Sequence, residues 1–532
     1  MASAEPYPSP PPSPVPSRVD PILRNVLRYT VSAKEYKTLH DYLITRSPPA
    51  VRKRAPPPAR VNSIARASDE HNAAAIRASL RVFIASQTGL QIWDQLTARI
   101  FGRGKPPKKK PRTSVFRSPN LRLSLSLSLI LLLHRVLFRF LTRLRGNLAT
   151  KDADPFRRRN PRIARALTSR LAPAAGASLA GFALGVYPAD QLRLTIAIYF
   201  ATRAAEYSYN LFEKEGWFRN KPTWWGSWMM MPLATGQLLH AFVFDRDCFP
   251  KAYGDFILSY TPNYLQRRPA AYPPSLPWPE PHTIVDSLAT MSRLNWPPFI
   301  SPMLFPNNPS PLPSALTSIS PITSPAHPSI PHLSCALLHP SNPSCAKTFL
   351  TYVLTAFPPL AKFFTLVFTV FSLPRYRSYL SSPFKEVNLL AKRVLRMTLF
   401  ITMAIGTSWG SICFFANAFP RHFLPTQRWF LGGFLGGLWG FLERKGGRSN
   451  FLYSVRMSID STWKVGKKRG WWSGIKGGDL GVFVMGLMVI NMIYERDASA
   501  VQGSMVRKGL GFLRGEGLMD RTIGTSEEEK KM

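Results

Sequence analysis

Apolar segments recur along the chain, and their lengths predict helices. Residues 120–141 combine a Leu–Ser alternation with an unbroken leucine run, and the segment is too long for a strand, so we expect a helix there. Further apolar segments cover residues 173–188, 191–212, 223–246, 347–373, 394–418, 428–442, 449–465 and 479–494. Several are shorter than the roughly 20 residues that a helix needs to cross hydrocarbon. The pattern predicts an all-α integral membrane protein with about eight spans.

The two apolar regions share an internal pattern. Each has a small-residue pair followed by Phe, then a Tyr, an acid seven residues after the Tyr, and a Gly-Trp pair ten residues after the acid. In the first region these are residues 180–182, Tyr199, Glu206 and 216–217; in the second they are residues 432–434, Tyr453, Asp460 and 470–471. Internal repeats are common in membrane transport folds. We therefore expect two repeated four-helix units joined by a Pro-rich irregular region.

Small residues repeat at every fourth position, which places them on one face of a helix. They are Ala177, Gly181 and Gly185 in the first region, and Gly406, Gly410, Gly432, Gly436 and Gly440 in the second. Such a stripe lets a neighbouring backbone approach closely, which favours helix association in lipid. The spacing predicts Gly-rich helix interfaces.

Changes in composition divide the chain into five parts. A basic, Pro-rich region (1–119) holds an amphipathic helix over 73–100, and the first four-helix membrane unit follows (120–250). Residues 251–346 form a Pro-rich linker or irregular soluble module, since 20 of the 50 prolines lie between 262 and 343. The second membrane unit (347–495) contains its four-helix repeat at 394–495, and a polar tail (496–532) ends the chain.

The charge is strongly positive and concentrated early in the chain. The 532 residues contain 69 Lys and Arg against 29 Asp and Glu, and the first 170 residues alone hold 33 basic and 9 acidic side chains. Such a basic arm suits nucleic acid, anionic lipid, or retention on one side of a membrane. No zinc-finger spacing, RNA-binding signature or phosphate loop accompanies it. We expect a lipid bilayer as partner, with other organelle membrane proteins or a second copy, and no nucleic acid.

Two acids within the apolar regions each have a base one turn earlier on the same helix. Glu206 follows Arg203 by three residues, and Asp460 follows Arg456 by four, so each acid can form an ion pair with that base. Charges inside membrane spans are costly and usually face the bundle interior or a wet cavity. The pairs therefore indicate either a polar path or a tether near the helix ends.

The stretch CALLHPSNPSC contains Cys335, His339 and Cys345, which could bind a metal or form a disulfide, or could remain unmodified thiols. The spacing fits no standard zinc finger, so no metal or cofactor is assigned. Cys248 and Cys413 stand alone and are expected to be inert. In HAFVFDRDC, a solvated helix end is favoured over a metal site, and no residue is assigned a catalytic role.

These segments resemble a known family. The stretch CALLHPSNPSC, the segment GGFLGGLWGFLERKGGRSNFLYSVRMSIDSTWKVGKKRG and the earlier AGFALGVYPADQLRLTIAIYFATRAAEYSYNLFEKEGW resemble the animal transmembrane protein 135 family, in the unit order of fungal-type relatives. The resemblance covers roughly residues 120–250 and 330–495. More distantly, the repeat is similar to the superfamily of mitochondrial inner-membrane import channels and peroxisomal membrane proteins. Its fingerprint of Arg, three residues and Asp matches Arg456 and Asp460, but the following glycines are displaced to Gly466 and Gly470.

The resemblance implies a multi-pass, non-enzymatic protein of mitochondrial or peroxisomal membranes. Members of the family are associated with organelle dynamics and lipid handling, and the family supplies no catalytic residue. We therefore expect a role in membrane dynamics and in lipid or metabolite homeostasis, by transport or scaffolding. The alternative is a subunit of an import channel of the mitochondrial inner-membrane translocase type, which would depend on Arg456 and Asp460.

Overall fold

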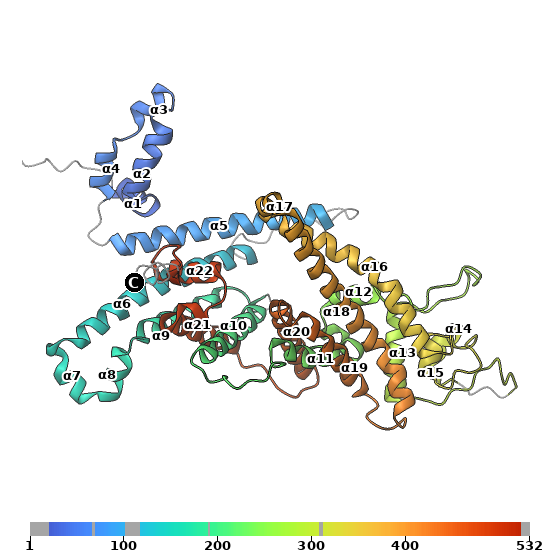
Figure 1. Ribbon diagram of the computed structural model, residues 1–532. Helices are drawn as coiled ribbons and strands as arrows, with labels where there is room; N and C mark the ends of the chain where they lie inside the picture. Colours follow the sequence, from blue (N-terminus) through green and yellow to red (C-terminus); the bar gives the residue numbers. More distant parts are fainter. Residues whose placement is uncertain (1–20, 66–69, 102–117, 190–191, 308–311, 523–532) are drawn as a thin grey trace, which may run out of the picture. The chain divides into compact units, whose positions relative to one another are not determined.

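A computed structural model describes residues 21–65, 70–101, 118–189, 192–307 and 312–522, and within these ranges the regular structure is helical (Figure 1). Four helical segments there are long and apolar enough to cross a membrane: Pro119–Ala149, Cys345–Ser381, Pro383–Ala418 and Gly478–Arg496. The all-α prediction is confirmed. The expected eight spans reduce to four, because the other apolar segments form helices that are too short or too polar.

The chain divides into two compact units. Unit 1 comprises Met1–Trp217 and Lys476–Met532, and unit 2 comprises Phe218–Ile475. The helices of unit 1 are α1 Pro21–Thr30, α2 Ala33–Leu39, α3 Pro49–Arg54, α4 Pro58–Ala65, α5 Glu70–Phe101, α6 Pro119–Ala149, α7 Asp154–Arg159, α8 Pro161–Thr168, α9 Ala172–Ala177, α10 Arg193–Lys214, α21 Gly478–Arg496 and α22 Ser504–Arg514. A 3₁₀ segment, η4 (Ser178–Val186), directly continues α9.

The helices of unit 2 are α11 Met230–Phe244, α12 Lys251–Ser259, α13 Pro281–Arg293, α14 Ser320–Thr323, α15 Leu333–Leu338, α16 Cys345–Ser372, α17 Tyr376–Ser381, α18 Pro383–Ala418, α19 Arg428–Leu438 and α20 Arg448–Lys468. The 3₁₀ segment η9 (Trp439–Glu443) continues α19, as η4 continues α9. In both units, therefore, a helix tightens into a 3₁₀ turn.

In unit 1, helix α6 packs against α5, α9 and η4, and α21 packs against α10 and η4 (Figure 1). The core between them includes Ile130, Leu184, Tyr187 and Leu487. Two serines of the Leu–Ser alternation in α6 donate their hydroxyls to backbone carbonyls. Ser126 donates to the Arg122 carbonyl at 2.8 Å, and Ser128 donates to the Ser79 carbonyl at 2.8 Å. Helix α5 covers the amphipathic helix predicted over 73–100.

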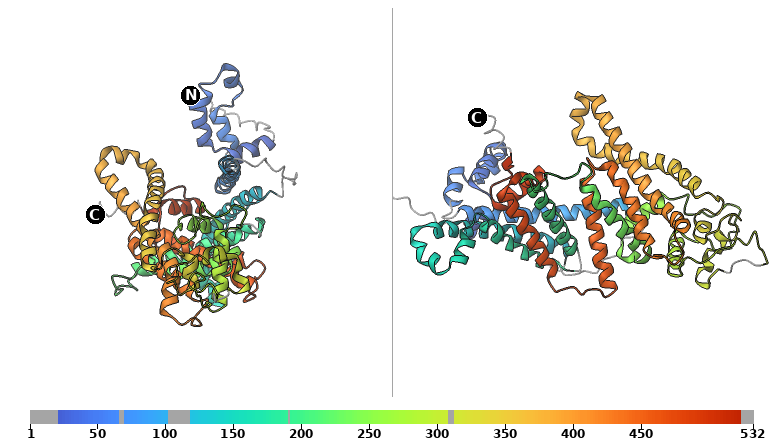
Figure 2. Two further views of the ribbon diagram at one scale, coloured as in Figure 1. Left: turned by 90° about the vertical axis from the view of Figure 1, so that its right-hand side faces the viewer. Right: turned by 60° about the horizontal axis from the view of Figure 1, so that its bottom comes forward.

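In unit 2, helix α11 runs along α19 and α20, and α18 packs against α16 and α19. Helices α16 and α18 lie side by side and are joined at one end through α17, as Figure 2 shows. Helix α16 keeps large apolar side chains exposed, with Leu354 66% and Phe371 76% exposed. An apolar face of this kind suits contact with hydrocarbon rather than water.

The Pro-rich region is an integral part of unit 2. Short helices between its prolines bury Ile284, Leu288, Leu316, Leu337 and Leu338 in the largest hydrophobic core of the described chain. Residues 251–346, interpreted from the sequence as a linker or an irregular module, thus contribute side chains to the core of unit 2. Pro281 and Pro321 lie in the first turns of α13 and α14, where a missing N–H costs nothing.

The unit boundaries also differ from the expected ones. Residues 223–246 were expected to complete a first membrane unit at 120–250, but α11 packs within unit 2. Likewise, α21 was expected in the second unit and packs within unit 1. Sequence proximity therefore does not decide which bundle these two helices join.

Candidate functional site

The described part of unit 2 contains a cluster of three cysteines and one histidine that could hold a metal ion. Cys335, His339, Cys345 and Cys413 each direct one donor atom inward, and these four atoms all lie within 4.8 Å of one another. Cys335 Sγ is 3.9 Å from Cys345 Sγ, and His339 Nε2 is 3.4 Å from Cys413 Sγ. Cys335, His339 and Cys413 are buried, and Cys345 is half-buried.

Local structure explains how the four side chains meet. Cys335 lies in α15, His339 caps its C-terminus, and Cys345 is the first residue of α16. Cys413 belongs to the last turns of α18, which packs against α16. The sequence located three of the four donors, but Cys413, expected to be isolated and inert, is the fourth. Only the packing of α16 on α18 reveals it.

The cysteines of this cluster are free thiols. The 3.9 Å between Cys335 Sγ and Cys345 Sγ is nearly twice a disulfide bond length of about 2.05 Å. Cys335 and Cys345 therefore do not form the disulfide that the sequence left open. The three thiols and the imidazole can instead offer four soft donors to one cation.

The acids singled out in the sequence both have basic partners. Arg203 Nη1 lies 2.7 Å from Glu206 Oε2, and Glu206 is buried, so the expected pair within α10 is present. Asp460 pairs with Lys464 at 2.5 Å on α20, while Arg456 Nε donates to the Leu452 carbonyl at 3.0 Å. Lys464, one turn after Asp460, was not anticipated as its partner.

The acids after α11 contact the basic end of α20 and thereby connect two helices of unit 2. Asp245 lies 2.6 Å from Arg469 and 3.5 Å from Lys468, and Asp247 lies 2.6 Å from Lys468. The hydrogen bond from the Lys468 ammonium holds the pKa of Asp247 below its usual range. Both carboxylates therefore form ion pairs with basic side chains of α20 and the residue that follows it.

Asp245 and Asp247 differ in burial, which predicts different mutational costs. The Asp245 side chain is 6% exposed and the Asp247 side chain 65% exposed. We expect Asp245→Asn to destabilise unit 2 by about 2 kcal/mol, since it weakens a buried charge-assisted hydrogen bond. Asp247→Asn should cost less than about 1 kcal/mol, as exposed ion pairs do. Thermal unfolding of the two detergent-purified variants measures the difference; equal losses would contradict the role of burial.

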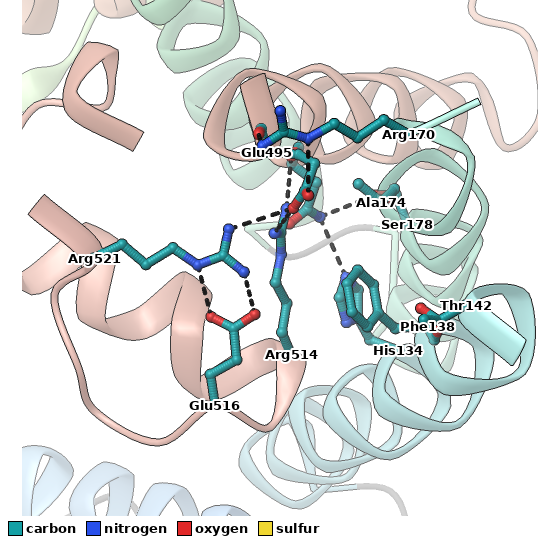
Figure 3. Close-up of polar contacts among 11 residues, drawn as sticks. His134, Phe138, Thr142, Arg170, Ala174, Ser178, Glu495, Arg514, Glu516 and Arg521 are labelled. Atoms are coloured by element: carbon teal, nitrogen blue, oxygen red, sulfur yellow. Dashed lines mark hydrogen bonds and ion pairs between the residues drawn. The ribbon is translucent and has the colours of Figure 1, made fainter. Parts of the chain in front are cut away.

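A second polar cluster lies inside unit 1, between two of the candidate spans (Figure 3). Asn491 of α21 donates to Ser178 Oγ at 2.9 Å and lies 3.3 Å from His134 Nε2 of α6. Ser178, at the junction of α9 and η4, donates in turn to the Ala174 carbonyl at 2.9 Å. All three side chains are fully buried. The cluster hydrogen-bonds three segments to one another within an apolar interior.

This cluster continues into charged groups at the end of α21. Arg514 of α22 donates to the Asn491 carbonyl at 2.7 Å and pairs with Glu495 (Figure 3). Glu495 also meets Arg521 at 3.4 Å and Arg170 at 3.7 Å. The sequence did not single out these residues because their partners are far apart along the chain.

The small residues of the predicted stripes lie against neighbouring helices. A Cβ on Gly181 or Gly185 would meet Val484 or Leu480 of α21, and one on Gly406 or Gly410 would meet Tyr352 or Phe349 of α16. On α19, Gly432 and Gly436 face Ser411 and Ala404 of α18. Gly440 faces Met231, and Ala177 is fully buried.

Comparisons with known proteins do not identify a relative: no family model, curated protein or solved structure matches this chain significantly. A functional assignment therefore depends on the residues and contacts described above.

Proposed function

We propose that this chain is a non-enzymatic multi-pass protein of a mitochondrial or peroxisomal membrane that handles lipid, by transport or scaffolding. The observation that carries the proposal is a narrow apolar cleft within unit 2. Helices α11, α12, α13, α18 and α19 enclose it, and its walls include Leu238, Phe242, Phe256, Leu288 and Phe400.

The chemistry of this cleft favours a hydrocarbon chain over a polar metabolite. Two of its hydroxyls are already used, because Thr235 donates to the Gly433 carbonyl at 2.8 Å and Ser408 donates to the Ala404 carbonyl at 2.8 Å. A ligand in the cleft would therefore gain mainly apolar contact, which suits an acyl chain. The exposed apolar face of α16 supports a position of the same unit in lipid.

We also propose that the two units are repeats that exchange one helix. Segments α6, α9–η4 and α10 of unit 1 correspond to α18, α19–η9 and α20 of unit 2. The remaining helices, α21 and α11, pack on equivalent surfaces. The aligned glycines support this, since Gly181 faces α21 and Gly433 faces α11. The Gly-Trp pairs support it too, because Gly216 and Gly470 both adopt positive φ, at 86° and 73°.

Photo-crosslinking tests the lipid proposal. Full-length protein in membranes should crosslink a phospholipid with a diazirine in its acyl chain, at peptides of α11 or α18. Ala404→Phe narrows the cleft and should lower crosslinking roughly tenfold, since overpacking costs about 1–3 kcal/mol. Ala391→Phe, at an exposed position on the same helix, is the matched control.

Two results would contradict the proposal. One is crosslinking that is absent, or unchanged in Ala404→Phe. The other is reconstituted protein that moves no labelled lipid between leaflets, together with unchanged organelle shape after deletion of the gene.

A further inference from the structure

We infer that Cys335, His339, Cys345 and Cys413 form a structural zinc site that fastens the Pro-rich module to helices α16 and α18. The inference is independent of the lipid proposal, because it concerns a different set of residues and chemistry. Three thiolates and one imidazole are a standard ligand set for tetrahedral Zn²⁺.

Two of the separations between donor atoms are close to those of a metal-centred tetrahedron. With Zn–S near 2.3 Å and Zn–N near 2.05 Å, two sulfurs lie about 3.8 Å apart and a sulfur and a nitrogen about 3.6 Å apart. The observed values are 3.9 Å for Cys335 Sγ to Cys345 Sγ and 3.4 Å for His339 Nε2 to Cys413 Sγ. The other donor pairs lie within 4.8 Å, so the four side chains would move closer by up to about 1 Å to surround one ion.

The imidazole is held in the orientation that a metal ligand requires. His339 Nδ1 lies 2.7 Å from the Asn342 carbonyl oxygen, which can only accept, so Nδ1 carries the proton. The lone pair is then on Nε2, the atom that faces Cys413. A backbone carbonyl on the non-ligating nitrogen is the usual support of zinc-bound histidine.

The surroundings indicate a structural rather than a catalytic ion. The protein supplies all four ligands, so no position is left for water or substrate. Soft thiolate donors with tetrahedral spacing select zinc over hard cations such as Mg²⁺ and Ca²⁺. An open groove bordered by Cys345, Cys413, Phe349 and Phe414 provides a route for the ion.

The position of the site defines what the ion would hold together. Cys345 begins α16 and Cys413 lies near the end of α18, so the site is at one end of this pair of candidate spans. Cys335 and His339 belong to the short α15 segment of the Pro-rich module. One ion would thus join α15 and the start of α16 to the end of α18, which is distant in sequence.

Elemental analysis of the full-length protein, purified in detergent from zinc-supplemented cells, tests the inference. We expect about one zinc per chain, and less than about one-fifth of that in Cys413→Ser. Cys248→Ser is the matched control and should keep its zinc, because Cys248 is buried apart from the cluster, in contact with other residues.

A measurement on the unmodified protein guards against a variant that does not fold. After chelation and reloading with Co²⁺, the wild-type protein should show thiolate-to-cobalt charge transfer and the intense visible bands of a tetrahedral site. The inference is overturned by wild-type protein without zinc, by zinc retained in Cys413→Ser, by iron or copper in its place, or by a Cys335–Cys345 disulfide in non-reducing peptide maps.

Discussion

Replacing Arg514 by Met should destabilise unit 1 by about 3 kcal/mol, because it leaves the buried end of α21 without its main cation. The Arg514 side chain is fully buried, pairs with Glu495 and donates to the Asn491 carbonyl at 2.7 Å. Its guanidinium also lies 4.7 Å from the Tyr494 ring and 5.2 Å from the Phe138 ring. Thermal unfolding in detergent and protease sensitivity of the segment after α21 measure the loss.

Arg170→Met is the matched control, since Arg170 approaches the same carboxylate, Glu495, at 3.7 Å. The Arg170 side chain is 68% exposed, however, and exposed pairs contribute less than about 1 kcal/mol. A loss from Arg170→Met as large as that from Arg514→Met would show that total charge, rather than the buried network, stabilises this end of α21.

Gly433→Ala should strongly destabilise unit 2, with an expected loss of about 3 kcal/mol. A Cβ at Gly433 would lie 2.4 Å from the Thr235 carbonyl oxygen and 2.9 Å from Gly236 Cα, both backbone atoms of α11. Helices α11 and α19 would have to separate, which would also break the hydrogen bond from Thr235 to the Gly433 carbonyl. The shift in thermal unfolding reports the loss.

Gly481→Ala, in contrast to Gly433→Ala, is expected to stabilise the protein. A Cβ there meets nothing within 4 Å, so the same substitution should stabilise α21 by about 0.5–1 kcal/mol through its higher helix propensity. If Gly433→Ala also proved neutral or stabilising, the close approach of α11 and α19 would not exist in the folded protein.

The helices themselves follow well from the sequence where apolar runs are long. Residues 120–141 lie in α6 and residues 394–418 in α18, because a continuous apolar run of that length leaves few alternatives to a helix. The buried residues of the Pro-rich region are harder to predict from the sequence. Leu316 and Leu338, for example, stand on helices too short to show a periodicity, so only the packed structure reveals them as core.

The candidate site was predictable to the extent that its donors are close in sequence. Cys335, His339 and Cys345 share one short stretch, whereas Cys413 joins them only because α18 packs on α16. Arg514 and Asn491 could not be predicted for the same reason: their partners lie on other helices, distant in sequence. Pairs within one helix, such as Arg203 and Glu206, could be anticipated because helical geometry alone brings them together.

The placement of α21 has a consequence for biosynthesis. Unit 2 is one uninterrupted stretch of chain, whereas unit 1 lacks α21 until all of unit 2 has been synthesised. During that interval the surfaces of α10 and η4 that α21 later covers are exposed, including Tyr207 and Leu184. The early helices therefore depend on a late one, and a premature stop codon after unit 2 would leave an intact second bundle beside an incomplete first one.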